Sequence, residues 1–334
     1  MRKYSLWIAS LAILAVPIIV LIVYMQLMIP LKLPQPISIN VERGDGMNMV
    51  AGKLEKSGVI RSALVIKLLA RWQHQGGNIQ AGSYRFSIPT TPQEVLNRLV
   101  AGDVEKVSLT LPEGFTLQQI IERMAAKGFG QKDKLLQLAY SPAFIKTLNI
   151  EATSLEGYLF PETYLFAPGV SEEQLFAMMV KQLRGHIDAE LQAQATKLGL
   201  SLHQWLTLAS IIEKETGIVT EMPLIASVFH NRLQRNIPLQ TDPTVIYGIK
   251  DYAGNITRKH LRTPTPYNTY LIRGLPPGPI ASPGLAAIKA AVQPAQSKYL
   301  YFVASGDGGH KFSKTLREHN VAVQEYLAQR RRSR

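Results

Sequence analysis

The chain has 334 residues, 46% of them hydrophobic and 18% charged, which predicts two or three folded units and excludes a mostly disordered protein. Cysteine is absent, and this excludes disulfide bonds, thiolate zinc sites and a cysteine nucleophile. The 37 Lys and Arg residues against 24 Asp and Glu give a net charge of +13. A basic excess of this kind suits an anionic partner, whether lipid headgroups, an acidic polymer or nucleic acid.

Residues 6–29 predict a membrane-spanning helix. The run is long enough to cross the hydrocarbon core of a bilayer, and few of its residues are polar (Ser10, Tyr24 and Gln26). The alternative is a cleaved signal peptide, which has a shorter apolar run and ends in a small-residue cleavage pattern. No such pattern appears in the proline-rich linker at residues 30–36, so we expect an uncleaved anchor.

The charges before this span predict its orientation. Arg2 and Lys3 lie in the short segment 1–5, and the positive-inside tendency places that segment in the cytoplasm. We therefore expect a single-pass membrane protein with nearly the whole chain on the extracytoplasmic side. Nucleic acid is not expected as a partner there.

Residues 37–130 predict a small module of strands and helices with an internal repeat at an offset of 70 residues. Residues 37–58 and 107–128 each show alternating apolar residues, a glycine, apolar residues at helical spacing and a second glycine. Short units of this kind resemble LysM-like carbohydrate-binding modules. The alternative is a pair of packing modules without a ligand. A connector at residues 131–153 follows.

Helix starts are predicted where a Ser or Thr precedes a Glu or Gln by three residues, because the two side chains can cap each other's backbone N–H groups. Four such pairs begin at Thr91, Thr116, Ser171 and Ser201. The pair at Ser171 predicts one helix that runs toward Leu198.

Residues 154–328 predict a mixed α+β catalytic domain with long helices. Its helix at residues 201–216 carries apolar side chains on one side, and Glu213 and Glu215 fall on the two flanks of that face. Either carboxyl could be half-buried at the end of the helix, where desolvation and the negative end of the helix dipole both raise a carboxyl pKa. A raised pKa is what a general acid requires. The alternative is that both are solvated glutamates of the last turn.

A proline-rich segment lies within the same domain. Six prolines between residues 264 and 283 fix the backbone over a stretch too rigid for a linker. Together with neighbouring Asn, Tyr, Thr and Gln side chains, it predicts a preformed groove wall for a polar, neutral substrate with sugar rings. The alternative is an ordinary structural loop. Residues 298–304 and 309–313 then predict a β-hairpin.

The sequence offers no signature of metal or cofactor chemistry. Its seven histidines include no pair four residues apart, and no phosphate-binding loop, G-x-S-x-G elbow or H-E-x-x-H helix occurs. We therefore expect neither a metal nor a cofactor.

Six segments carry a resemblance to a known family. They are residues 155–164 (LEGYLFPETY), 209–216 (ASIIEKET), 240–248 (QTDPTVIYG), 265–270 (TPYNTY), 274–277 (GLPP) and 299–304 (YLYFVA). Through them the chain resembles the endolytic murein transglycosylase family, also called YceG-like, over nearly its full length. These motifs show no departure from the family pattern, whereas the basic tail at residues 329–334 lies outside it.

The resemblance implies a lytic transglycosylase, a lyase that cuts the glycan strands of peptidoglycan internally and close to the membrane. The bond cut is MurNAc-β-1,4-GlcNAc, and the product carries a 1,6-anhydro-MurNAc end. The catalytic glutamate of the family corresponds to Glu215 in the E-K-E-T segment at residues 213–216. Glu213 is the alternative. The resemblance further suggests a role in limiting or terminating nascent strands, with peptidoglycan synthases (penicillin-binding proteins) as candidate partners.

The candidate residues for orienting the strand are Tyr158, Glu162, Gln240, Asp242, Asn268 and Tyr270. Two rival functions stay open. A glycoside hydrolase would use Glu215 with a second carboxylate, Glu162 or Asp242, and would release reducing ends. A noncatalytic cell-wall-binding scaffold would bind glycan and cleave nothing.

Overall fold

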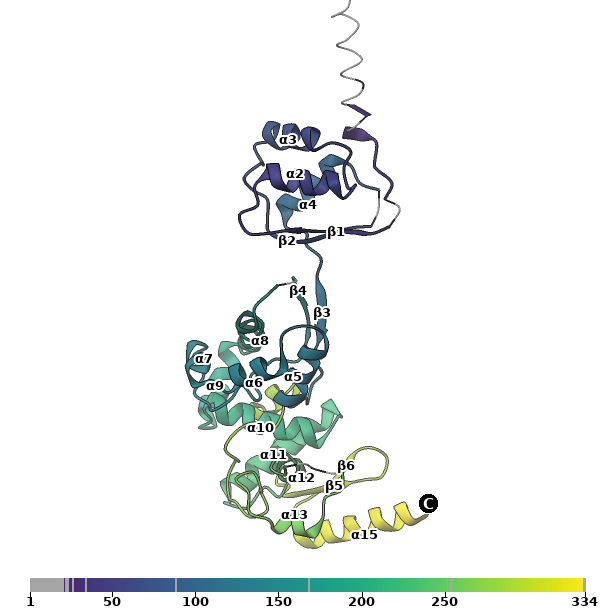
Figure 1. The fold of residues 1–334 in the computed structure, drawn as a ribbon. Helices are drawn as coiled ribbons and strands as arrows, with labels where there is room; N and C mark the ends of the chain where they lie inside the picture. The colour runs from purple at the N-terminus through teal and green to yellow at the C-terminus, as the bar shows by residue number, and fades with distance from the viewer. Residues whose placement is uncertain are drawn as a thin grey trace, which may run out of the picture. The chain divides into compact units, whose positions relative to one another are not determined.

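The computed structural model describes residues 21, 24–25, 27–33, 35–87, 89–167, 169–250, 252 and 254–332 (Figure 1). Their contacts divide them into two compact units. The N-terminal unit extends to Ser108 and takes in Leu165–Val170, and the C-terminal unit comprises Leu109–Tyr164 and the described residues from Ser171 onward. Helices combine with small two-stranded sheets along the chain, which confirms the predicted mixed α+β class.

The predicted membrane helix at residues 6–29 lies mostly outside the described residues, as does all of segment 1–5. Among the residues that the structure does describe, no helix is both long enough and apolar enough to span a bilayer. The anchor and its orientation therefore stay predictions.

The N-terminal unit packs helices against a two-stranded antiparallel sheet. Strand β1 (Ile37–Val41) pairs with β2 (Gly82–Phe86). The helices packed with this sheet are α2 (Met47–Lys56), α3 (Ala63–Trp72) and α4 (Pro92–Ala101) (Figure 1). Alternate residues of β2 enter the core, where Tyr84 and Phe86 are fully buried beside Leu54 and Leu96.

The predicted repeat is present in the backbone. Strand β3 (Val107–Thr110) and helix α5 (Leu117–Ala126) repeat the arrangement of β1 and α2. Glycines mark the same places in both copies, and Gly44, Gly58, Gly114 and Gly128 have φ angles from +71° to +95°, which glycine adopts freely. The copies lie in different units, because the contacts divide the chain at Ser108, inside the predicted module of residues 37–130.

The C-terminal unit is built around α10 (Leu202–Glu215). Every residue from Trp205 to Ile212 is buried, so α10 is enclosed on all sides. The sequence predicts burial along one apolar face only. Helices α11 (Met222–Gln234) and α14 (Leu285–Val292) pack against it. The Trp205 indole also donates a 2.7 Å hydrogen bond to the Ile288 carbonyl.

Two further sheets and the remaining helices complete the part of the chain that the structure describes. Strand β3 pairs with β4 (Thr163–Phe166), and β5 (Tyr301–Ala304) pairs with β6 (His310–Ser313) in the predicted hairpin. The remaining helices are α6 (Lys132–Ala139) and α7 (Pro142–Thr147) in the predicted connector, then α8 (Glu172–His186), α9 (Ala189–Lys197), η1 (Val219–Glu221), α12 (Asp242–Tyr247), α13 (Arg258–Arg262) and α15 (Leu316–Arg332).

All four predicted helix starts form capping boxes, at α4, α5, α8 and α10. The helix that begins after Ser171 is shorter than predicted. It ends at His186, and Asp188 caps a new helix by accepting a 2.8 Å hydrogen bond from the Leu191 N–H. A local cap thus divides a helical stretch that periodicity alone reads as continuous.

The later part of the proline-rich segment, residues 278–284, is buried in the C-terminal unit. The Ser282 N–H donates to the Phe115 carbonyl (2.8 Å), and its carbonyl accepts from the Gly114 N–H (2.9 Å). The Ile280 N–H donates to Ser210 Oγ in the middle of α10 (3.0 Å). This stretch is therefore core structure that ties α10 to the segment before α5, at a place where the sequence predicts a preformed groove wall.

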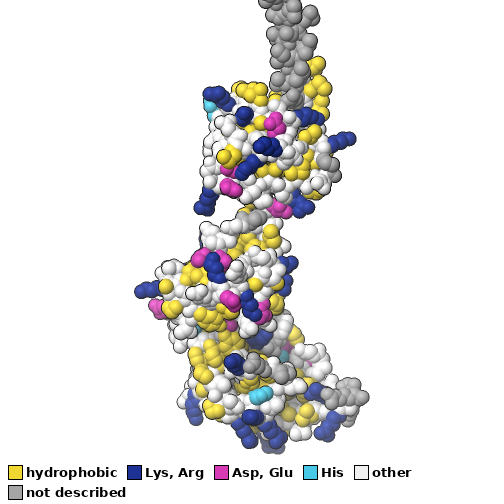
Figure 2. All heavy atoms as spheres, viewed as in Figure 1, with side chains coloured by type: hydrophobic (Ala, Val, Ile, Leu, Met, Phe, Trp, Pro, Cys, Tyr) yellow, Lys and Arg dark blue, Asp and Glu magenta, His cyan; other side chains and the backbone are white. Residues whose placement is uncertain are grey.

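Charged side chains cover much of the surface. Figure 2 shows Lys and Arg on the visible face of each unit, with Asp and Glu among them. Ion pairs such as Lys132 with Glu122 (2.8 Å) join exposed side chains, where water and salt screen the attraction.

Candidate active site

Glu215 is the last residue of α10, so the enclosed helix carries its carboxyl group to the edge of the core. The side chain is half-buried, and its Oε1 accepts a hydrogen bond from the Thr241 hydroxyl. Burial raises the pKa of Glu215 to about 7; the Thr241 bond opposes this rise, and the charge of Asp242 adds to it. A carboxyl group with this pKa can both donate and accept a proton near neutral pH.

A cavity of about 360 Å³ opens beside Glu215. Its polar lining includes Glu215, Arg232, Gln240, Asp242, Tyr270 and His319. These side chains belong to α10, α11, the start of α12 and α15 and the loops between them, so segments far apart in sequence meet at one carboxyl. The described residues contain no group of three or more His, Cys, Asp or Glu side chains that could hold a metal ion.

The backbone beside Glu215 is held in an uncommon conformation. Gln240 has a φ of +53°, a left-handed value that costs a residue other than glycine about 1–3 kcal/mol. Its N–H donates to the Thr269 carbonyl (3.0 Å), and the Thr241 N–H donates to Thr269 Oγ1 (3.1 Å). These bonds fix Thr241 where its hydroxyl reaches Glu215.

Asp242 and Tyr270 form a second polar pair on the cavity wall. The Tyr270 hydroxyl donates to Asp242 Oδ1 at 2.7 Å. Burial and this bond to Asp242 raise the pKa of Tyr270 above its ordinary value, so the phenol stays a neutral donor at physiological pH. Asp242 is exposed on its other side and supplies a carboxylate to the same cavity as Glu215.

Arg232, Tyr301 and His319 also line this cavity and were not among the predicted site residues. The Arg232 guanidinium lies 5.0 Å from the centre of the Tyr301 ring, and that ring stacks on His319 with centroids 5.2 Å apart. One signal could have found Arg232. It follows Val228 by four residues and Phe229 by three, which places a charged residue on the buried face of α11.

Glu213 occupies a different environment from Glu215, although only one residue separates them. Its Oε2 accepts a 3.0 Å hydrogen bond from the Gly284 N–H at the start of α14. Burial raises the pKa of Glu213, the bond from Gly284 opposes the rise, and the charge of Glu113 adds to it. Glu213 does not line the 360 Å³ cavity. The geometry therefore favours Glu215 as the acid.

Three predicted binding residues lie away from this cavity. Tyr158 is buried, and its hydroxyl pairs with His203 Nδ1 at 2.9 Å, near the other end of α10. Glu162 is exposed, and its Oε2 accepts from the Gln182 amide. Asn268 is fully buried, and its amide donates to backbone carbonyls at the end of α13. The structure thus brings only Gln240, Asp242 and Tyr270 to Glu215.

A second buried acid, Glu156, was not among the predicted site residues although it lies in the first matching motif. Both of its oxygens accept from the Leu117 N–H (2.9 and 3.1 Å), and Oε2 also accepts from the Tyr247 hydroxyl (3.0 Å). Burial raises the pKa of Glu156 to about 7, against these hydrogen bonds. Its partners are the start of α5 and the end of α12, so its role is to join two helices.

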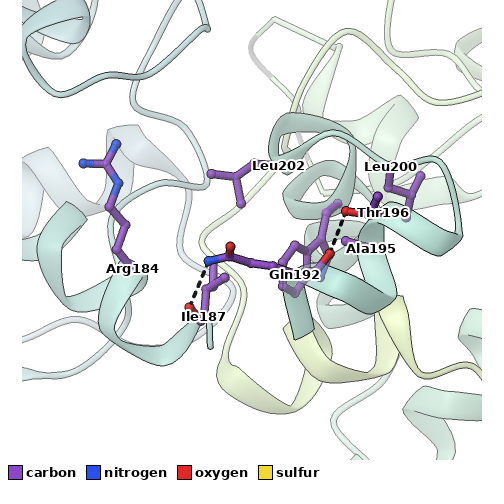
Figure 3. Close-up of a pocket in the computed structure, with 8 residues that line it drawn as sticks. Arg184, Ile187, Gln192, Ala195, Thr196, Leu200 and Leu202 are labelled. Carbon is purple, nitrogen blue, oxygen red and sulfur yellow. Dashed lines mark hydrogen bonds between the residues drawn. The ribbon is translucent and has the colours of Figure 1, made fainter. Parts of the chain in front are cut away.

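Another cavity, of about 430 Å³, lies between α8, α9 and the start of α10 (Figure 3). Its lining is mostly apolar and includes Ile187, Leu202 and Trp205. In Figure 3 the Gln192 amide donates to the Ile187 carbonyl, so this polar group is already bonded. No carboxyl group lines this cavity, so it offers no acid for acid–base chemistry.

The YceG-like family model matches residues 39–325 of this chain. An endolytic murein transglycosylase of Bacillus subtilis (strain 168) is 34% identical over 308 residues, which cover 87% of this chain and 85% of the relative. One of Streptococcus pneumoniae serotype 2 is 28% identical over 323 residues, which cover 87% of this chain but only 58% of the relative. The crystal structure of a yceG-like protein from Listeria monocytogenes shows 36% identity and a TM-score of 0.60, covering 86% of this chain and 98% of that one.

The raised pKa of Glu215 can be tested by titration. With carbon-13 labels at the glutamate carboxyls, NMR should show two resonances that titrate near pH 7, because burial disfavours the charged forms of Glu215 and Glu156. One resonance should vanish in Glu215→Gln and the other in Glu156→Gln. The exposed Glu162 provides the control, since Glu162→Gln should remove neither. A Glu215 resonance that titrates near 4.5 would contradict its burial.

Proposed function

The chain belongs to the YceG-like family, and from this membership and the geometry around Glu215 we propose that it is an endolytic murein transglycosylase. The substrate is the glycan strand of peptidoglycan. The observation that carries the proposal is a half-buried carboxyl of raised pKa on the wall of a cavity lined with hydrogen-bonding groups. This is the arrangement that cleavage of a glycosidic bond by a single acid requires.

Glu215 supplies both proton transfers of the reaction. Protonated Glu215 donates its proton to the glycosidic oxygen as the bond from C1 of MurNAc to that oxygen breaks. The resulting carboxylate then takes the proton of the C6 hydroxyl of the same MurNAc, whose oxygen attacks C1 and closes a 1,6-anhydro ring. The substrate provides the nucleophile, so one carboxyl suffices, unlike the paired carboxylates of ordinary glycosidases.

The neighbouring groups hold the acid and the strand. Thr241 fixes the orientation of the Glu215 carboxyl through its hydroxyl. Gln240 and the Asp242–Tyr270 pair place hydrogen-bonding groups on the cavity wall, where they orient the sugar units. Backbone bonds to Thr269 hold Gln240 and Thr241, and Asn268 Oδ1 accepts from the Tyr270 N–H, so this part of the cavity is preformed.

A hydrolase remains the second candidate, because Asp242 places a second carboxylate in the Glu215 cavity. With Asp242 as a base, water would replace the C6 hydroxyl and the product would have a reducing end. Glu162, the other partner considered, is exposed and bonded to Gln182 away from the cavity. The mass of the new end separates the two reactions, since the anhydro product lacks one water.

Glu215→Gln should abolish formation of anhydro ends, because the amide keeps the shape of the side chain but cannot donate a proton to the leaving oxygen. General acid–base catalysis contributes about 10² to 10⁴ in rate. Glu213→Gln is the matched control and should cost less, since Glu213 binds the Gly284 N–H outside the cavity. Digestion of purified glycan strands followed by mass spectrometry measures both variants.

Four results would contradict parts of this proposal. If Glu213→Gln were inactive and Glu215→Gln active, the acid would be Glu213. If both variants kept full activity, the proposed acid–base mechanism would be wrong. Reducing ends from the wild-type protein would establish the hydrolase, and no cleavage at all would leave a noncatalytic wall-binding scaffold.

We also propose that residues 6–29 anchor the protein in the inner membrane and that the catalytic unit works on the periplasmic side. The support is the apolar run after Arg2 and Lys3. A reporter that works only outside the cytoplasm should be active when fused after Arg334, and one that works only inside should be silent at the same position. The opposite pair of results would overturn the orientation and, with it, access to the cell wall.

We propose further that the N-terminal unit is the LysM-like part that binds peptidoglycan. The support is its compact core of helices on a two-stranded sheet, separate from the Glu215 cavity in its contacts. A fragment of residues 35–108 should co-sediment with peptidoglycan at about 0.15 M salt, where exposed charges are screened over roughly 8 Å. Binding that disappears between low salt and that concentration would show charge attraction only.

A further inference from the structure

Arg232 is a buried cation on the wall of the Glu215 cavity. Only 6% of its surface is exposed, and it lines that cavity from α11. In the described part of the chain, none of the ion pairs includes it. A charge removed from water is costly unless a partner compensates for it, so an unpaired guanidinium on a cavity wall requires an explanation.

The protein itself binds one edge of the guanidinium. Nε donates to the Leu300 carbonyl at 2.6 Å, and Nη1 donates to the carbonyls of Pro238 and Leu239, both at 3.0 Å, and to Gln240 Oε1 at 3.2 Å. These bonds fix the plane of the group. Within the described residues Nη2 takes part in none of these bonds, although an arginine has five N–H donors. Its two hydrogens are left for a ligand in the cavity.

The other ionisable groups of the cavity do not form an ion pair with Arg232. The Glu215 carboxyl accepts from Thr241, and Asp242 accepts from Tyr270. His319 adds no second cation, because burial and the neighbouring Arg232 lower its pKa and keep it neutral near pH 7. Arg232 is thus the group in this cavity suited to bind a negatively charged part of a ligand.

We propose that Arg232 binds a carboxylate of the glycan strand and so positions the strand beside Glu215. The proposal rests on the proposed function. Murein offers carboxylates that a neutral glycan lacks, namely the lactyl group of MurNAc where the stem peptide has been removed, and the carboxylates of the peptide where it is present. Arginine recognises a carboxylate through directed N–H bonds, and the fixed plane of Arg232 reduces the entropy lost on binding.

A buried arginine on the cavity wall changes the expected chemistry of the substrate. The proline-rich segment alone suggests a polar, neutral ligand, whereas a buried arginine selects for charge. A purely structural Arg232 would need only the four bonds of Nε and Nη1 to backbone and Gln240 oxygens. The two roles differ in one measurable property, the dependence of KM on the charge of the substrate.

The test compares KM for strands with free carboxylates and for the same strands with their carboxyls converted to amides. Wild-type protein should show a KM about tenfold to a hundredfold higher on the amidated strands, the range expected for a hydrogen bond to a charged group. Peptide-free and peptide-bearing strands are both used. A difference on peptide-free strands identifies the lactyl carboxylate, and a difference confined to peptide-bearing strands identifies the peptide.

Arg232→Gln should remove this KM difference, because it removes the charge, while a loss of structure alone would affect both substrates equally. Arg232→Lys, which keeps the charge but not the planar fork, should reduce the difference. Arg184→Gln is the control, because Arg184 also donates to backbone carbonyls but lies outside the cavity, and it should keep the wild-type difference.

Equal KM values for the two kinds of strand in wild-type protein would overturn carboxylate binding and leave the transglycosylase intact. A wild-type difference preserved in both Arg232 variants would also overturn it. If wild-type protein cleaves none of the strands, the proposed function fails first. If Arg232→Gln does not fold, two measurements still decide whether Arg232 binds a carboxylate. They are the KM difference between carboxylate and amidated strands in wild-type protein and the same difference in Arg232→Lys.

Discussion

The proton on Glu215 depends on where α10 ends relative to the core. Because every residue from Trp205 to Ile212 is enclosed, the last turn brings Glu215 to a cavity while its carboxyl stays half-buried. Partial loss of water raises its pKa to about 7. Two residues correspond to about 200° of helical rotation, so Glu213 points elsewhere and binds the Gly284 N–H.

The rest of the C-terminal unit keeps α10 and its cavity in place. Residues 278–284 bond to Ser210 within α10 and to the segment before α5. Glu156 ties the start of α5 to Tyr247 at the end of α12, and α12 begins with Asp242 on the cavity wall. The reactive loop from Gln240 to Asp242 is therefore carried by regular elements on both sides, which is how a loop can hold catalytic geometry.

The cavity combines hydrogen-bonding groups suited to a neutral sugar with one group suited to a charge. Hydrogen-bonding side chains of Gln240, Asp242 and Tyr270 suit hydroxyl and amide groups, and Arg232 suits a carboxylate. MurNAc carries all of these groups on one ring system. A site that makes both kinds of contact can distinguish murein from uncharged polymers of N-acetylglucosamine. A buried charge left without a partner loses more binding free energy than a hydroxyl contact left unmade.

Features that depend on neighbouring residues followed from the amino-acid sequence. The capping boxes, the turn glycines of the repeat and the hairpin at residues 298–313 formed as predicted, since each is decided by atoms within a few residues. The position of Glu215 at the end of a helix is also decided locally, whereas its catalytic role stays a proposal. The division of the chain at Ser108, by contrast, depends on which helices share a core.

Long-range packing decided the composition of the site. Asn268 and Tyr158 have the polar groups of binding residues, but burial against the end of α13 and His203 satisfies them with protein partners. Arg232 carries no local motif and becomes a cavity residue only because α11 packs beside the hairpin and the loop before α12. Local sequence determines which groups a segment offers, and tertiary packing determines which of them remain free to meet a substrate, because hydrogen-bond partners and water are assigned only when distant segments come together.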